Sequence, residues 1–148
     1  MHNKTPTEQR PKRLSFSLAS RCNICCQEED TAGHLLFTCN QGNSLWRWIF
    51  KAASIQAPSS FSASSIWLAL ARRNDASGIR YMAAIFISVI HTLWKARNEV
   101  TFDDHMTPLH QIKLQLQVSL SISLQKISKP YCSPQIRSML HFLKVPER

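Results

Sequence analysis

The sequence is poor in the residues on which most nucleotide-dependent enzymes rely. Its 148 residues include nine Asp plus Glu and three glycines, and the glycines stand alone at positions 33, 42 and 78. No glycine-rich loop can therefore cradle a phosphate chain. Long apolar runs are absent too, since the longest uncharged one, residues 81–94, has 14 residues, whereas a membrane span needs roughly 20. We expect no membrane partner and a buried core helix in that region.

Cysteine is neither abundant nor spread along the chain in the manner of a disulfide framework. Four of the five cysteines lie between positions 22 and 39, and no secretory apolar region follows Met1. A reducing, intracellular setting, nuclear or cytoplasmic, is the expectation. The apolar content of 44% is sufficient for a folded core.

Basic residues outnumber acidic residues, and the two kinds are unevenly distributed. Eighteen Lys plus Arg give a formal net charge of +9, which is typical of proteins that meet nucleic acid or an anionic surface. Residues 1–21 carry five bases and one acid, whereas residues 22–39 carry three acids and no base. A phosphate-binding surface is therefore predicted on the flanks, with Lys12, Arg13 and Arg21 as its first candidates.

A cluster of sulfur and imidazole ligands is the strongest chemical signal. Cys22, Cys25, His34 and Cys39 follow the spacing C-x2-C-x8-H-x4-C, and three thiolates with one imidazole suit tetrahedral Zn²⁺. Four protein ligands leave no position for water or substrate, so the ion would be structural. Cys26 is an alternative to Cys25, or a free thiol, although the x2 spacing favours Cys25. The competing interpretation, four small core residues, explains the spacing less well.

The predicted zinc loop is too long to be ordered by the ion alone. Zinc binding offsets only part of the conformational entropy lost when residues 22–39 become ordered. Leu35, Leu36, Phe37 and Trp46 are the apolar side chains nearest the predicted ligands. We therefore expect the loop to dock on neighbouring helices.

Apolar periodicity predicts a mainly α fold, in which a small zinc-stapled N-terminal unit packs on a helical, bundle-like extension. The expected division is a basic arm over 1–21, a zinc-binding unit over 22–58 and a helical extension over 59–148. The predicted helices run from a Thr31 cap to Cys39, from Ser44 after a break at 40–43, from Ser62 to Ala71, from Ile79 to Asp104, from Thr107-Pro108 to about residue 127, and from Ser133-Pro134 onward.

The segment 109–127 has a pattern that fits two structures. Its apolar residues alternate with Gln and Ser between 114 and 124, which is a strand signal, whereas Leu109, Ile112, Leu116 and Leu120 form a helical seam. A strand here would lack a partner for its backbone, so we predict a helix.

Two stretches carry a resemblance to a known family. They are residues 6–46, with Pro6-Thr7, 17–22, Cys25, 28–30, 34–37, Cys39 and Trp46, and residues 93–98 with Phe102. The first resembles the zinc-binding domain that follows the polymerase in plant non-LTR (LINE-type) retrotransposon reverse transcriptases. The second resembles the segment that leads to their RNase H region. Family members often have glycine where Cys26 stands. The resemblance implies a detached or domesticated piece that keeps the metal module and lacks the catalytic parts.

The acidic residues do not compose a polymerase or nuclease site. Asp103-Asp104 is preceded by Thr101 where the Tyr-x-Asp-Asp loop of reverse transcriptases has its aromatic residue, so we interpret the pair as a solvated helix end. We expect a non-enzymatic, zinc-stabilised module that binds RNA or DNA through basic flanks. The alternatives are a scaffold that self-associates or binds protein through the 109–127 helix, and a remnant without selected activity.

Overall fold

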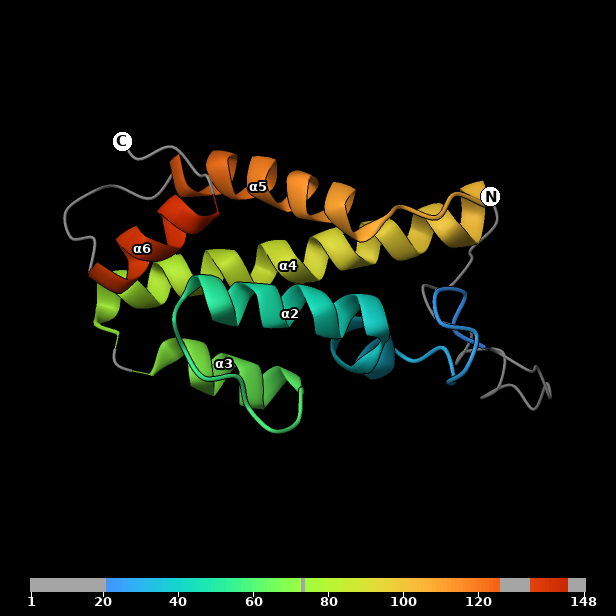
Figure 1. Cartoon of the computed structure of the whole chain (residues 1–148), viewed down its shortest axis with the longest axis horizontal. Coiled ribbons are helices and arrows are strands. Elements are labelled where there is room, and N and C mark those ends of the chain that lie inside the picture. The colour runs from blue at the N-terminus through green and yellow to red at the C-terminus, as the bar shows by residue number, and fades with distance from the viewer. Residues whose placement is uncertain (1–20, 73, 126–133, 144–148) are drawn as a thin grey trace.

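The computed structural model describes residues 21–72, 74–125 and 134–143, which are mainly helical and include no extended sheet strand (Figure 1). The predicted fold class is confirmed, because the Cys/His motif lies at the N-terminal end and packs on helices. The elements are a π-helical turn η1 (His34–Thr38) and the helices α2 (Asn40–Ala52), α3 (Ala63–Ala71), α4 (Ala76–Asp103), α5 (Leu109–Gln125) and α6 (Pro134–Phe142).

Helix α4 is the long central element, and Figure 1 shows it running along most of the body. Its 28 residues begin after Asp75, whose carboxylate accepts a hydrogen bond of 2.8 Å from the Gly78 N–H. It starts three residues before the predicted Ile79, because this cap brings residues 76–78 into its first turn. Length and composition alone would allow α4 to cross a membrane. Its contacts with η1, α2, α3 and α5 bury 44% of its apolar 18-residue window.

Helix α2 begins at Asn40, so the break expected over residues 40–43 is wrong. Those residues are poor helix formers, but the Cys39 carbonyl accepts a 2.7 Å hydrogen bond from the Asn43 N–H and starts the helix. Its buried face includes Leu45, Trp46 and Ile49. The Trp46 indole N–H also donates to the Leu36 carbonyl at 2.8 Å, which fixes α2 against η1.

Helix α3 starts where its cap predicts. The Ser62 hydroxyl accepts from the Ser65 N–H at 3.1 Å, and the Ser65 hydroxyl accepts from the Ser62 N–H at 2.9 Å. Two of the N–H groups that a helix start leaves without partners are satisfied in this way.

The segment with the ambiguous pattern is helix α5, as predicted. Ile112, Leu116 and Leu120 are 0% exposed, and α5 packs chiefly on α4. The other apolar set, Leu114, Val118 and Ile122, is 58%, 61% and 54% exposed. The period-two pattern thus arises from two apolar seams on opposite sides of one helix.

One core cluster joins the N-terminal and C-terminal elements. It extends from Phe37, beside the metal motif, to Leu143 after α6, and it includes the buried faces of α2, α4 and α5. Trp48 and Trp67 pack at its edge. The elements that carry the metal motif are therefore built on the same core as the helices that follow position 58.

Candidate metal centre

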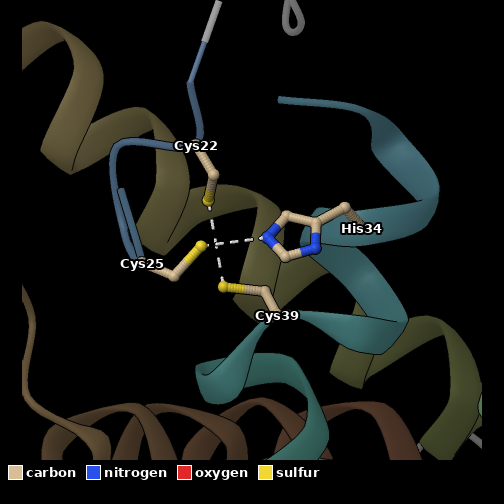
Figure 2. Close-up of side chains that lie close together, drawn as sticks. All are labelled: Cys22, Cys25, His34 and Cys39. Carbon is tan, nitrogen blue, oxygen red and sulfur yellow. Dashed lines mark hydrogen bonds between the residues drawn. The ribbon is translucent and has the colours of Figure 1, made fainter. Parts of the chain in front are cut away.

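A tight turn brings the first two cysteines together. Arg21 and Glu29 form an antiparallel bridge, and the Cys22 N–H donates to the Glu28 carbonyl at 2.9 Å. Within this hairpin, the Cys26 N–H donates to the Cys22 carbonyl at 2.8 Å. Both Cys22 and Cys25 lie on the inside of the turn as a result, and their sulfurs face the same point (Figure 2).

The third and fourth donors come from the two ends of η1. The Thr31 hydroxyl accepts a 3.1 Å hydrogen bond from the His34 N–H, so Thr31 caps this turn as predicted. The Cys39 N–H then donates to the His34 carbonyl at 2.7 Å, across five residues instead of the usual four. Such widened turns often mark functional positions. Here the wide turn lets both side chains converge on the cysteine hairpin.

The four donor atoms converge in the geometry of a metal site. Cys22 Sγ, Cys25 Sγ, His34 Nε2 and Cys39 Sγ all lie within 4.8 Å of one another, and Figure 2 shows them pointing to a common centre. The Sγ atoms of Cys22 and Cys39 are 3.8 Å apart, and Cys25 Sγ lies 3.2 Å from His34 Nε2. A tetrahedral ion with Zn–S bonds of about 2.3 Å would place two sulfurs about 3.8 Å apart. A disulfide would need about 2.05 Å.

A hydrogen bond between two of the sulfurs shifts the pKa values of both. The hydrogen bond with Cys39 lowers the pKa of Cys22 to about 5, although burial acts in the opposite direction. The same hydrogen bond, together with burial, raises the pKa of Cys39. The proton of this hydrogen bond lies between two sulfurs that could both be metal ligands. A divalent cation that replaces this proton can bind both as thiolates.

His34 is held by its second ring nitrogen. Nδ1 lies 3.0 Å from the Thr38 hydroxyl, which itself donates to the His34 carbonyl at 3.5 Å. Thr38 Oγ1 can thus accept a hydrogen bond from Nδ1–H, which leaves the Nε2 lone pair for a metal. Thr38 was not among the predicted site residues. Its position four residues after His34 could have indicated this contact, because side chains four residues apart are neighbours on a helix.

A buried ion pair attaches the metal loop to α4. Asp30 Oδ2 and Arg97 Nη2 are 2.5 Å apart, and both side chains are 2% exposed. Asn23 Nδ2 donates to Thr101 Oγ1 at 3.1 Å one turn further along α4. The two partners of the ion pair are separated by 67 positions, so no local pattern could reveal it. The loop is docked, as its length predicted.

The alternative and basic candidates fall outside this cluster. Cys26 is exposed and has φ 57°, and its sulfur is not among the converging donors. Arg21 is exposed at the base of the hairpin, whereas Lys12 and Arg13 lie outside the described residues. The seam expected to meet a partner is in fact internal, because Ile112, Leu116 and Leu120 pack in the core and Leu109 is half-buried.

Comparison with known protein families gives a match in the N-terminal part of the chain. Residues 1–46 match the model of a family described as zinc-binding in reverse transcriptase. Searches among curated proteins and among solved structures found no match. The matched segment contains all four converging donors and ends at Trp46, whose indole anchors α2 to η1. The N-terminal part of the chain is thus similar to a zinc-binding module of reverse transcriptases.

Proposed function

We propose that the chain is a structural-zinc module that binds nucleic acid and has no catalytic activity of its own. Its origin would be the polyprotein of a plant LINE-type retrotransposon reverse transcriptase, with residues 93–102 derived from the segment toward the RNase H region. We place its action inside the cell, in the nucleus or cytoplasm and away from membranes. The convergence of three sulfurs and one imidazole within 4.8 Å carries the proposal.

Zinc fits this donor set better than the other common divalent ions. Thiolates are soft ligands, whereas Mg²⁺ and Ca²⁺ prefer oxygen. Cys22 and Cys39 are buried, and four protein donors complete a tetrahedron without water. The ion would hold the hairpin 21–30 against η1 and α4, so residues 22–39 keep one conformation. No coordination position remains for a substrate, which supports a non-catalytic function.

The net charge of +9 supports nucleic acid as the partner. A body with this excess of Lys and Arg attracts the phosphate backbone and releases its counterions, without a need to recognise bases. Most of the tryptophan surface is committed to packing, since Trp46 is buried and Trp48 and Trp67 lie against the core. Binding should therefore depend on charge and show little sequence preference.

The decisive experiment combines metal content with salt-dependent binding of the purified chain. We expect a single zinc ion per chain and binding to labelled single-stranded RNA or DNA that weakens steeply from about 50 mM to about 200 mM salt. Zinc-free protein with an intact fold would contradict the metal assignment. Absent binding at low salt, or binding that salt does not affect, would contradict the nucleic-acid assignment.

A scaffold function is the second candidate, and the exposed seam of α5 favours it. Leu114, Val118 and Ile122 lie on the surface, and residues 114–125 include no charged side chain, so two copies could pair there despite their net charge. Sedimentation should then show a dimer that Val118→Asp dissociates and that Ile87→Asp, at an exposed apolar site on α4, leaves intact. A monomer at all concentrations would eliminate this candidate.

A further inference from the structure

Acidic side chains gather at the end of the molecule that holds the metal motif. We define the metal end as residues 21–39 and 95–104, which the Asp30–Arg97 pair joins. It carries three bases, Arg21, Lys95 and Arg97, and six acids, Glu28, Glu29, Asp30, Glu99, Asp103 and Asp104. Three thiolates around a divalent ion would add one more negative charge. Within the part of the chain that the structure describes, this end therefore has a net negative charge, which disfavours a phosphate backbone.

The rest of the described chain has the opposite charge. It carries six bases, Arg47, Lys51, Arg72, Arg80, Lys113 and Arg137, and a single acid, Asp75. Helices α2, α5 and α6 contain no Asp or Glu at all. Figure 1 shows α6 at the opposite end of the body from the metal loop, with α2 running between them. Among the described residues, the positive charge that would attract an anion therefore lies away from the metal motif.

The outer face of α2 is the best-organised basic surface in this region. Asn40, Ser44, Arg47 and Lys51 are all exposed and recur at helical spacing, so they form one polar stripe opposite the buried Leu45 and Ile49. Arg47 and Lys51 lie on successive helical turns of this stripe. No ion pair within the described residues engages either of them.

Local contacts hold the basic groups in place. Arg47 Nε donates to Asn43 Oδ1 at 2.8 Å, and its guanidinium carbon lies 5.4 Å from the centre of the Phe61 ring. These contacts restrain the Arg47 side chain, so its terminal guanidinium nitrogens would lose little conformational entropy on binding an anion. On the neighbouring helix, Lys113 Nζ lies 5.2 Å from the centre of the Trp48 ring. Lys113 therefore lies beside α2 on the side that faces α5, whereas Arg47 leans toward Phe61.

We infer that the α2 face, formed by Arg47 and Lys51 with Lys113 beside them, is where the phosphate backbone of a single-stranded nucleic acid docks. The inference rests on the proposed function and specifies its surface, which differs from the predicted Lys12, Arg13 and Arg21. Lys113 covers one face of Trp48, and Phe142 lies against the same indole with ring centres 6.2 Å apart. Phosphate contact, and not base stacking, is the recognition that this surface offers.

The test is the salt dependence of binding to a fluorescent oligothymidylate, measured by anisotropy. Removing two phosphate contacts with Arg47→Ala/Lys51→Ala should flatten the slope of log K against log salt by about 1.4, since each contact on a single strand contributes about 0.7. Lys51→Glu provides a second variant. The Lys51 side chain is exposed and takes no part in the contacts that hold Arg47. This reversal of charge should weaken binding more than Lys51→Ala would. The far-UV helical signal of each variant shows whether the fold is retained.

The matched control is Arg80→Ala/Lys95→Ala on α4. Both residues are exposed and lie within one stripe of that helix, so this variant loses the same net charge at another surface. It should change the slope much less than the α2 variant. Equal effects of the two pairs would overturn the inference, because they would show that only total charge matters.

Other outcomes separate the inference from the proposed function. If Lys12→Ala/Arg13→Ala abolishes binding while the α2 variants bind normally, the nucleic-acid function stands and the α2 surface is wrong. If the unmodified chain binds no oligonucleotide at low salt, both are wrong. Binding of anionic lipid vesicles through Arg47 and Lys51, without oligonucleotide binding, would also overturn the inference and assign the surface to a membrane.

Discussion

Cys26 occupies a backbone position that suits glycine, and its sulfur lies outside the four converging donors. Its φ of 57° is in the left-handed region, which costs a residue with a Cβ about 1–2 kcal/mol. This is also the position at which the resembling family often has glycine. The turn reverses at Cys26, so its side chain leaves the site while Cys25 Sγ stays 3.2 Å from His34 Nε2. The two-residue spacing was therefore the correct guide to the converging pair.

Replacing Cys26 with glycine should leave the metal site intact. We expect Cys26→Gly to retain zinc and to change the free energy of unfolding by less than about 1 kcal/mol, because relief of the left-handed strain is offset by the greater freedom of glycine in the unfolded chain. Cys25→Ala should lose zinc or bind it far more weakly. Elemental analysis after dialysis against a mild chelator measures both. Equal zinc loss in the two variants would make Cys26 a ligand.

The ion pair between Asp30 and Arg97 offers a second measurement at the scale of single residues. Asp30→Asn leaves the Arg97 charge buried without its counter-charge, which should destabilise the protein by about 3–5 kcal/mol. Lys95→Met breaks only an exposed pair with Glu99, at 3.9 Å, and should cost no more than about 1 kcal/mol. Urea unfolding compares the two. A loss for Asp30→Asn no larger than that for Lys95→Met would mean that the pair does not anchor the loop.

At the scale of elements, sequence periodicity predicted where the helices lie better than it predicted how they pack. The alternation in α5 could not show which apolar seam is internal, because residues 112, 116 and 120 and residues 114, 118 and 122 fit a helix equally well. Contact with α4 decided it, and that contact is not local in sequence. The start of α2 was missed for the opposite reason. Asn and Gly favour a break by propensity, but the end of η1 caps them into a helix.

The contact between η1 and α2 depends on the absence of a side chain at Gly42. A Cβ there would lie 2.9 Å from the Leu35 carbonyl oxygen and 3.1 Å from that of Leu36. Backbone oxygens cannot move aside as a side chain can, so Gly42→Ala should push η1 away from α2. We expect a loss of about 1–3 kcal/mol in the free energy of unfolding. Zinc affinity should also weaken, because His34 is the first residue of η1 and Cys39 directly follows its last.

Gly33→Ala is the matched control for that change. A Cβ at Gly33 meets nothing within 4 Å, and its φ of −62° is helical. Alanine there should be neutral or stabilise by up to about 1 kcal/mol. Chemical unfolding with zinc, and competition with a chromogenic chelator, report stability and affinity separately. If the two alanine variants behave alike, the close approach at Gly42 is not what positions the turn.

At the scale of the whole molecule, the sequence predicted those features that depend on neighbouring residues. It did not predict the contacts between residues that are far apart in the chain. The ligand spacing and the helical class were accessible because each is encoded within a few tens of residues. The Asp30–Arg97 pair and the separation of charge between the metal end and the α2 face were not, because they depend on which distant segments lie together. The N-terminal bases predicted from sequence proximity to the metal motif lie next to its acidic loop in the chain. Whether Lys12, Arg13 and Arg21 bind nucleic acid stays a prediction, and the α2 variants described above separate it from the α2 surface.

Removal of the metal tests how far the ion's influence extends through the fold. The core cluster joins α2 to α6 through apolar contacts that need no ion, whereas residues 21–39 depend on the four donors and on Asp30. Chelation should therefore raise amide hydrogen exchange over residues 21–39 strongly while α4 and α5 stay protected. Cys39→Ala should give the same exchange pattern without chelator. Global loss of protection would show instead that the helical body cannot fold without its metal, and that the two parts are a single cooperative unit.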